Sequence, residues 1–443
     1  MYFTCEQIAE VLWSFPVLIG ILAVSIFVTV ALKFVQITYF KDAIKSVFSS
    51  ATSASEKTKS ESLTPLQAFI NTLGGNIGNG ALAGIPTAIA TGGPGSIFWL
   101  LLMATFAVAL RFAEVYLGMA VIGKQRFGSA KGGPVVYLSM LPGGRYLAYI
   151  FGILCLTYTF ASGSIVQCNA VGLAIYKAWN IPQMWTAMFI MAFVLYVMFG
   201  GSARIVRVLD RIVPLKVSLL LVSALIVLIY HYAMIPHALY LIFASAFTGK
   251  AVAGGGIGFA VQKAMSVGFQ RSIFAHEAGL GTAAVAFGNT SGEHPAKDAI
   301  MSTLGVFLTV HVICFLVALC VLVTGVWQNG ESSSALIISA YETVFGKFAG
   351  WIITFLTINF GVSVFVSYAY IGRQCWEFLT NKRYLLLFSI LYALGAGLGT
   401  VLNVSLAWCL SDIVNAALFV VNMMGILWFL PVIKKGLLAY KRS

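Results

Sequence analysis

Long runs of apolar residues, separated by short polar segments, dominate the chain. A run of about 20 apolar residues is long enough to cross the hydrocarbon core of a bilayer as a helix. Eleven such runs lie roughly at 12–35, 66–92, 95–123, 146–177, 182–200, 212–234, 269–290, 298–327, 347–372, 384–404 and 411–433. The pattern therefore predicts an all-α integral membrane protein with about eleven transmembrane helices.

Clusters of glycine interrupt two of these runs. One run is broken in segment 73–84 (LGGNIGNGALAG) and another in segment 277–284 (EAGLGTAA). Glycine lowers the cost of unwinding a helix, and unwound backbone survives at membrane depth only where it faces protein, water or a ligand. Paired interruptions, one in each half of a chain, indicate the substrate and ion site of a secondary transporter.

Three further segments carry weaker signals. Segment 248–268 is Gly-rich and weakly amphipathic, which favours a re-entrant or surface piece over a full span. The run 12–35 follows an acidic N-terminus and is longer than the apolar part of a signal peptide, so we expect it to be retained as a span. The longest polar stretch, 49–64, is a short linker and leaves no room for a folded soluble domain.

The distribution of Lys and Arg predicts the orientation. If the basic tail 434–442 lies inside, eleven spans place the N-terminus outside. Of the 27 Lys and Arg residues, the segments then predicted to be cytoplasmic hold 21, namely Lys33, Lys41, Lys45, Lys57, Lys59, Lys124, Arg126, Lys131, Arg145, Arg204, Arg207, Arg211, Lys216, Lys297, Arg373, Lys382, Arg383, Lys434, Lys435, Lys441 and Arg442. The outside segments hold Lys177, Lys250 and Lys347, and Arg111, Lys263 and Arg271 lie within or near spans. The net charge of +13 is thereby explained by cytoplasmic loops beside anionic lipid, without nucleic acid.

In this orientation the two interrupted spans run in opposite directions. Ten spans divide as five plus five of opposite topology after one extra N-terminal span, as in transporters built from inverted repeats. The predicted organisation is an N-terminal span and linker (1–65), a first repeat (66–234), a Gly-rich connection (235–268), a second repeat (269–433) and a basic cytoplasmic tail (434–443).

Composition excludes a soluble protein. Hydrophobic residues make up 60% of the chain and charged residues 9%, with a mean hydropathy of +0.94, whereas a soluble chain carries about 25% charged residues. The seven cysteines show no metal-binding spacing, most lie inside apolar runs, and no disulfide is expected from them.

Several short motifs occur in a characteristic order. They are GGPGSIFW (92–99), RFAEV (111–115), KGGP (131–134), QCN (167–169), FAHEAGLG (274–281), Gly305-Val-Phe307 with Cys314, and Gly372 with Cys375. In these motifs the chain resembles, over nearly its whole length, the alanine/glycine:cation symporters, which include sodium:alanine symporters and D-alanine/glycine permeases. The resemblance implies the leucine-transporter fold and cation-driven uptake of small neutral amino acids.

Four positions depart from the family pattern. Residues 78–84 read GNGALAG where the family has Gly-Thr-Gly-Asn-Ile-Ala-Gly, and His276 replaces an Asn. Residues 368–372 read YAYIG in place of Trp-Ser-Tyr-Tyr-Gly, and two neighbouring hydroxyl residues of the family appear as Ser363 and Val364. Three of these changes fall where the pocket would touch its substrate, and one falls where a hydroxyl would touch sodium.

The substrate site is predicted at Gly78, Asn79, Gly80, Gln167, Phe274, Glu277 and Tyr368. N-termini of half-helices direct free N–H groups at a carboxylate, although close helix packing through small residues is the alternative role for the glycines. The resemblance places Gln167 near the substrate and implies that Phe274 and Tyr368 form the pocket floor, with Tyr370 a weaker candidate. Asn169, two residues from Gln167, is interpreted as a structural residue that bonds between helices.

Ionisable residues inside spans are functional candidates by default. Glu277 either contributes to the site or accepts hydrogen bonds from the unwound backbone. His276 is a proton-binding candidate, with a hydrogen-bonded packing residue as the favoured alternative. Arg111 and Glu114, spaced i,i+3, are predicted to form an intrahelical pair; Asp412 with Asn415 is interpreted as a boundary feature of the last span.

A monovalent cation site is predicted between carbonyls of the first break, around Asn76 and Asn79, and the hydroxyl of Ser363. No organic cofactor is expected. We expect a monomeric, multi-pass transporter of the bacterial cytoplasmic (inner) membrane that imports alanine, D-alanine or glycine with Na⁺. A proton-coupled symporter, or an uncoupled exchanger of a different small amino acid, is the alternative. No Ser/His, paired-Asp or His-Glu-x-x-His arrangement in the spans favours an enzyme.

Overall fold

A computed structural model describes residues 2–53, 63–122, 127–247, 257–290, 294–331, 333–402 and 405–442. Within these residues the chain is all-helical, apart from two isolated bridges, Leu63 with Thr290 and Phe127 with Ala130. Five basic residues used to predict the topology lie outside the described residues: Lys57, Lys59, Lys124, Arg126 and Lys250.

The N-terminal half contains the elements α1 (Tyr2–Leu12), α2 (Phe15–Ala31), α3 (Val35–Thr38), α4 (Phe40–Ser53), α5 (Pro65–Asn76), η2 (Gly80–Gly84), α6 (Ile85–Gly92), α7 (Gly95–Ala120), α8 (Pro134–Ser139), α9 (Gly144–Tyr158), η3 (Thr159–Ile165), α10 (Val166–Trp179), α11 (Gln183–Phe199) and α12 (Gly201–Tyr230). The C-terminal half contains η4 (Tyr232–Met234), α13 (Ile235–Phe247), α14 (Ile257–His276), α15 (Thr282–Phe287), α16 (Pro295–Val306), η5 (Phe307–Cys314), α17 (Phe315–Val323), η6 (Val326–Gln328), α18 (Ser333–Phe345), η7 (Gly346–Phe348), α19 (Ala349–Leu379), α20 (Leu385–Val401), α21 (Ser405–Trp428) and α22 (Leu430–Arg442).

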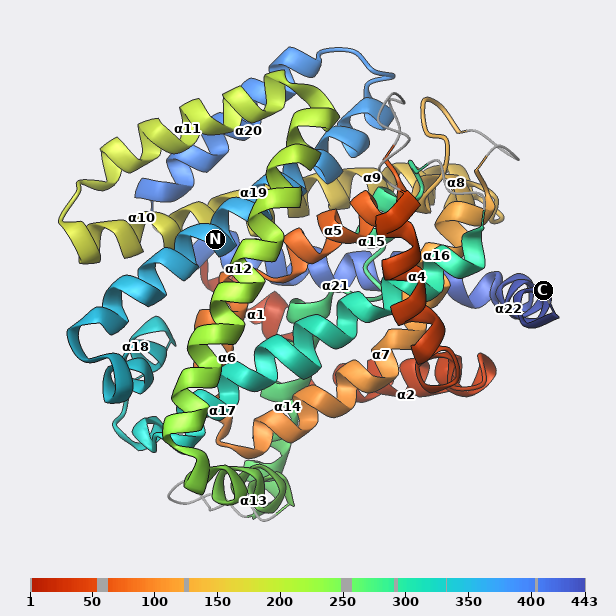
Figure 1. Cartoon of the computed structure of the whole chain (residues 1–443). Helices are drawn as coiled ribbons and strands as arrows, with labels where there is room; N and C mark the ends of the chain where they lie inside the picture. Colours follow the sequence, from red (N-terminus) through yellow and green to blue (C-terminus); the bar gives the residue numbers. More distant parts are fainter. Residues whose placement is uncertain are drawn as a thin grey trace.

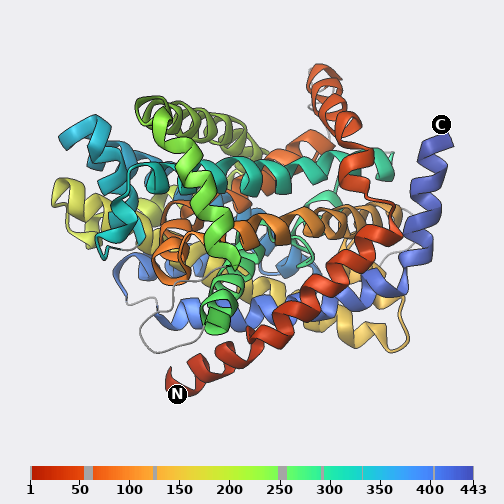
Figure 2. The same cartoon turned by 90° about the horizontal axis from the view of Figure 1, so that it is seen from below.

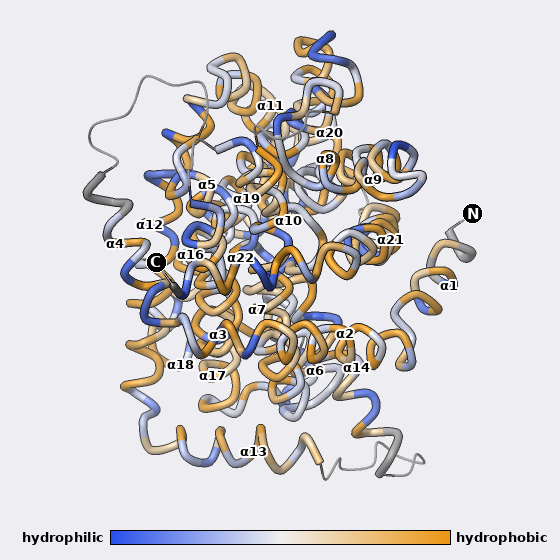
Figure 3. Tube along the Cα trace, turned by 90° about the vertical axis from the view of Figure 1, so that its right-hand side faces the viewer, coloured by the Kyte–Doolittle hydropathy of each residue, from blue (hydrophilic) through white to orange (hydrophobic). Residues whose placement is uncertain are grey.

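The apolar runs fold as helices, as the sequence predicts. Six helical segments of the described chain are long and apolar enough to cross a membrane: Gly95–Ala120, Gly144–Trp179, Gly201–Tyr230, Pro295–Val323, Ser333–Leu379 and Leu406–Trp428. Four shorter apolar helices lie at Phe15–Ala31, Gln183–Phe199, Tyr232–Phe247 and Leu385–Val401. The hydrophobic colouring along most of the tube in Figure 3 shows the same pattern in space. The chain is therefore a multi-pass membrane protein.

Two helices lie partly or wholly outside the predicted runs. α12 begins at Gly201, before the apolar run near residue 212, because arginine is a good helix former and Arg204, Arg207 and Arg211 extend the helix beyond its apolar part. α18 lies between two predicted runs, in a segment too short to register as a span.

The Gly-rich segment before the second break is also helical in its described part, since α14 begins at Ile257. Gly268 reflects close packing rather than a break: a Cβ there would lie 2.3 Å from the carbonyl oxygen of Ser96. The glycine thus lets α14 approach α7 closely, as small residues do between membrane helices.

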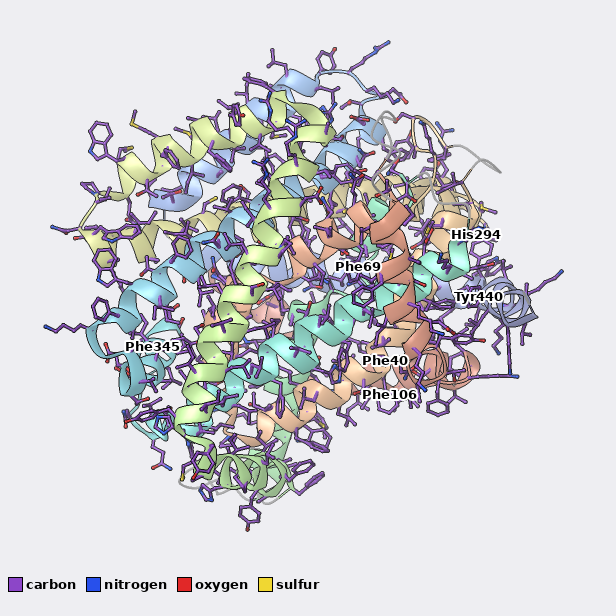
Figure 4. All side chains as sticks on the ribbon, in the orientation of Figure 1. Phe40, Phe69, Phe106, His294, Phe345 and Tyr440 are labelled. Atoms are coloured by element: carbon purple, nitrogen blue, oxygen red, sulfur yellow. A yellow bond between two sulfur atoms is a disulfide. The ribbon has the colours of Figure 1, made fainter. Side chains whose placement is uncertain are left out.

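α7 forms the centre of the molecule. It packs against α2, α13, α14 and α16, and many of its residues are fully buried. In Figure 1 it crosses the middle of the bundle below α16 and α17, while α11 and α20 lie side by side at one edge. Side chains fill the space between these ribbons, as the labelled Phe69 and Phe106 illustrate in Figure 4.

Large apolar side chains cover much of the outside. On α11, Trp185 and Phe189 are 64% and 73% exposed, and Tyr240 on α13 is 67% exposed. Exposed apolar area of this extent is typical of a surface that contacts another apolar phase. The N-terminal helices run along the outer edge of the bundle in Figure 2.

A disulfide joins two helices from opposite ends of the chain, in contrast to the expectation from the sequence. Cys5 in α1 is bonded to Cys409 in α21, and their Cα atoms are 6.2 Å apart. Sequence reasoning missed the pair because 404 positions separate the two residues and spacing alone does not reveal connectivity. The other five cysteines are free and buried.

Candidate functional site

Both predicted helix breaks are present. α5 ends at Asn76 and the chain resumes a helical course at Gly80, after Ile77 leaves helical geometry with ψ of 79°. α14 ends at His276 and α15 starts at Thr282. Between them, Glu277, Gly279 and Gly281 have φ of +52°, +92° and +86°, a left-handed geometry that glycine adopts at low cost.

One backbone carbonyl ties the two breaks together. The side-chain amide of Asn76, at the end of α5, donates to the carbonyl oxygen of His276 at the end of α14 over 3.0 Å. The guanidinium of Arg111 on α7 donates to the same oxygen. The two interruptions, 200 residues apart in the sequence, therefore meet at one point in the interior.

Glu114 of α7 bonds the unwound backbone of the second break. Its carboxylate accepts hydrogen bonds from the backbone N–H groups of Gly279 and Gly281, each over 2.9 Å. The carboxylate also pairs with Arg111 at 3.1 Å, and the side-chain amide of Asn422 on α21 donates to both Glu114 and the carbonyl of Gly279. The predicted Arg111–Glu114 pair is confirmed, and it also satisfies backbone groups that the break leaves without helical partners.

Glu277 has different partners from those expected. Its carboxylate accepts hydrogen bonds from the hydroxyls of Tyr158 and Thr282, each over 3.0 Å, and from that of Tyr368. The rings of Tyr158 and Tyr368 meet edge to face with centroids 5.7 Å apart. The suggestion that Glu277 supports unwound backbone is therefore wrong, because Glu114 fills that role.

A cavity of ≈ 50 Å³ lies between the breaks. It is lined by Gly75, Asn76, Gly78, Gly80, Ala81, Ser162, Gln167, Arg271, Phe274, Ala275, Glu277, Val364, Tyr368 and Trp408. Six of the seven predicted substrate residues are among them, and they come from η2, α10, α14, α19 and both breaks. Such a volume accommodates only a few water-sized groups.

Asn79 is the predicted substrate residue that does not line this cavity. Its side chain is 6% exposed and faces α19, where the Nδ2 atom lies 3.1 Å from the position of a Cβ at Gly361. Only its backbone reaches the site, because the Asn79 N–H donates to the Gln167 Oε1 over 3.2 Å. Gln167 thus fixes the backbone of the first break while its side chain lines the cavity.

Two other polar residues have structural roles. Asn169 donates to the carbonyls of Gly399 and Leu402, each over 3.1 Å, so its interpretation as a bond between helices is confirmed. His276 is fully buried, and its Nδ1 accepts the N–H of Ala278 over 2.8 Å.

Sequence reasoning missed Arg271 and Trp408 as cavity residues. Arg271 on α14 was noted only as a charge near a span, but its position three residues before Phe274 places both on one helix face. Trp408 lies at the start of α21, and no local motif marks it. Phe274 also packs on Trp13, with ring centroids 5.7 Å apart, which adds an N-terminal residue behind the cavity wall.

Lys216 lies in the interior of the protein and not in a cytoplasmic segment as the sequence predicts. It was counted among cytoplasmic basic residues, yet it is fully buried in the middle of α12. Its Nζ donates to the carbonyl of Gly74 over 3.1 Å, to that of Ile77, and to the hydroxyl of Ser363. These oxygens belong to the first break and to α19, where the sequence predicts a cation.

A second, wider cavity of ≈ 670 Å³ opens beside the same helices. Gln67 of α5, Asp210 of α12 and Tyr370 of α19 contribute to its wall. Its rim carries four basic residues that the topology assigns to the cytoplasm, Lys131, Arg207, Arg373 and Lys382. The geometry thus places a small cavity between two broken helices and a larger cavity with charged lining residues beside it, an arrangement that suits a transporter.

Comparison with known proteins agrees with this class. The chain belongs to the sodium:alanine symporter family, whose sequence profile matches residues 2–443. An uncharacterized transporter of Haemophilus influenzae is 30% identical over 431 residues, which cover 97% of this chain and 93% of that protein. The sodium/alanine symporter AgcS of Methanococcus maripaludis is 29% identical over 423 residues, covering 94% and 92%.

A solved structure shares the fold. A mutant form of the manganese transporter from Eremococcus coleocola superposes with a TM-score of 0.52 at 15% identity, covering 81% of this chain and 76% of that one. At this identity the likeness supports the fold and carries no information on the solute.

Proposed function

We propose that the chain is a secondary active transporter that imports a small neutral amino acid, namely alanine, D-alanine or glycine, by cation-driven symport through alternating access. The observation that carries the proposal is the cavity of ≈ 50 Å³ between the two helix breaks, in a member of the sodium:alanine symporter family. Its size suits a solute with few non-hydrogen atoms.

Opposite charges at the cavity wall suit a zwitterion. The guanidinium of Arg271 on this wall offers donors and a positive charge to a carboxylate. In the first break, the N–H groups of Gly78 and Asn79 already bond the Asn76 carbonyl and the Gln167 Oε1. Glu277 and unwound carbonyls near Phe274 supply acceptors for an ammonium. Tyr368 and Phe274 limit the space for a side chain.

We also propose a cation site at the first break. Asn76, Asn79 and Ser363 are our proposed ligands, through unwound carbonyls and one hydroxyl. Family membership favours sodium as the coupling ion, and the position of Lys216 Nζ beside Ser363 favours a proton as the second candidate.

The proposed architecture is one extra N-terminal helix followed by two inverted repeats of five spans, residues 66–234 and 269–433. The protein is proposed to work as a monomer in a bacterial inner membrane, with the N-terminus outside. The wide cavity rimmed by Lys131 and Arg373 then opens to the cytoplasm, which supports an inward-facing state.

Uptake into proteoliposomes tests the proposed function. Radiolabelled alanine should accumulate, and unlabelled glycine, L-alanine and D-alanine should compete, whereas leucine and glutamate should not. If no small neutral amino acid inhibits uptake, the proposed substrate class is wrong.

A pair of glutamine variants links this uptake to the cavity. Gln167→Ala removes a cavity side chain and its hydrogen bond to the first break, so uptake should fall. The matched control is Gln328→Ala, an exposed glutamine away from the cavity, which should transport like the wild type. Equal uptake by the two variants would mean that the solute does not pass through this cavity.

A further inference from the structure

A lysine ammonium occupies the place at which the sequence predicts a bound cation. The Nζ atom of Lys216 has three oxygen partners: the carbonyls of Gly74 and Ile77 at the end of α5, and the hydroxyl of Ser363 on α19. The Ser363 hydroxyl also bonds the Gly74 carbonyl over 3.1 Å. An ammonium has three donors, so these three oxygens match it one for one.

This ammonium has no acidic partner among the described residues. The ion pairs there are Arg111–Glu114 and Arg373–Glu377. α5 holds no ionisable residue, and the first one after Ser363 on α19 is Tyr368, whose hydroxyl bonds Glu277. On α12 itself, Asp210 lies nearly two turns before Lys216 and faces the wide cavity.

The remaining helices that pack on α12 bring their titratable groups to other parts of it. Tyr341 of α18 contacts Ser223, and Cys320 of α17 contacts the Ala224 carbonyl, both about two turns beyond Lys216. His311 of η5 contacts Thr105 of α7 instead. The oxygens that surround the Lys216 ammonium are therefore neutral.

The setting resembles that of a bound monovalent metal ion. One positive charge is held by neutral oxygens at a helix break, as unwound carbonyls hold Na⁺ or H⁺ in transporters. The face of the Phe360 ring, 5.3 Å from Nζ, adds a further contact that suits a cation. Next to Ser363, Val364 presents a methyl group in place of another oxygen ligand, close to Gly78.

We propose that the Lys216 ammonium is the resident cation of this transporter and takes the place of the sodium ion at this site. The proposal rests on the proposed function only in assuming that the first break moves during transport. An ammonium tethered to α12 links α5 to α19. It differs from Na⁺ in that it can leave its ligands only by moving with its helix.

Ion dependence of the wild-type protein is the first test. In proteoliposomes, alanine uptake should stay within about twofold when Na⁺ is replaced by choline. A sodium-coupled site would instead change substrate affinity by about 5- to 150-fold. A sodium effect of that size in the wild type overturns the proposal.

Lys216→Met is the second test, with Lys434→Met on the exposed face of the C-terminal helix as the matched control. Methionine keeps an unbranched side chain and removes the charge. We expect the variant to lose most of its uptake, because the ammonium that links α5 to α19 is gone, while Lys434→Met keeps it. Uptake by Lys216→Met at the wild-type level overturns the proposal.

A measurement that does not depend on transport distinguishes the role of Lys216 from the proposed function. The Tm of the purified wild type should be the same in NaCl and in KCl. The double variant Lys216→Met, Val364→Thr should instead show a higher Tm in NaCl than in KCl, because the oxygens that held the ammonium and the new hydroxyl can bind Na⁺. A sodium-specific rise in the wild type contradicts a resident ammonium. If no small neutral amino acid binds but these melting results hold, the substrate assignment is wrong and the role of Lys216 stands.

Discussion

At the scale of single residues, Gly80 offers the sharpest test of the substrate pocket. It lines the cavity, and a Cβ added there would have no heavy atom within 4 Å. Gly80→Ala should therefore fold normally but occupy space that the solute needs. One extra methylene-sized group changes kcat/KM by about 10- to 200-fold in a tight pocket. KM for alanine should therefore rise at least tenfold, and KM for glycine should rise less.

The control for this prediction is Gly350→Ala, since a Cβ at Gly350 also meets no atom within 4 Å and the residue lies away from the cavity. Uptake by this variant should equal that of the wild type. Equal KM values for alanine in Gly80→Ala and wild type would show that the solute binds elsewhere.

Some of the site is readable from the sequence at this scale, and some is not. Glycine clusters and an intramembrane acid are rare enough to stand out, which is why Gly78, Gly80 and Glu277 could be predicted as cavity residues. Lys216 could not, because it lies near the cytoplasmic arginines of α12 in the sequence and only the packing of α12 on α5 shows that it points inward.

At the scale of elements, the second break depends on a carboxylate from a neighbouring helix. Glu114 accepts two backbone N–H groups of the break and neutralises Arg111, both fully or nearly fully buried. Glu114→Gln keeps the shape but leaves Arg111 as an unpaired buried charge, a change that costs about 3–5 kcal/mol. We expect a fall in Tm of several degrees and poor expression.

The comparison for that experiment is Glu342→Gln, on the exposed face of α18. This variant should melt with the wild type, because exposed charges contribute little. A Glu114→Gln protein as stable as Glu342→Gln would mean that the break holds its geometry without the carboxylate.

Hydropathy predicted the positions of the helices better than it predicted where they begin and end. The apolar runs and both breaks match observed elements, since burial of apolar residues and the flexibility of glycine act locally. The start of α12 could not be predicted in this way, because polar residues that continue a helix beyond its apolar part leave no hydropathy signal. α18 was missed for another reason, because its 13 residues are fewer than a span needs.

At the scale of the whole molecule, the disulfide restricts the topology. Cys5 and Cys409 are bonded, so α1 and the start of α21 lie on the same side of the membrane. The bias of Lys and Arg predicts that this side is the outside, and disulfides persist in oxidising compartments such as the bacterial periplasm. The proposed orientation, with the N-terminus outside, is compatible with both the disulfide and the bias of Lys and Arg.

Cysteine labelling in intact cells tests this orientation. A membrane-impermeant reductant followed by an impermeant maleimide should label Cys5, because reduction would release its partly exposed thiol on the outside. Cys155 and Cys168 are buried and should stay unlabelled, which provides the control within one protein. A Cys409→Ser variant should leave Cys5 labelled without reductant. If labelling of Cys5 appears only in inside-out vesicles, the chain is inserted in the opposite direction and the wide cavity opens to the outside.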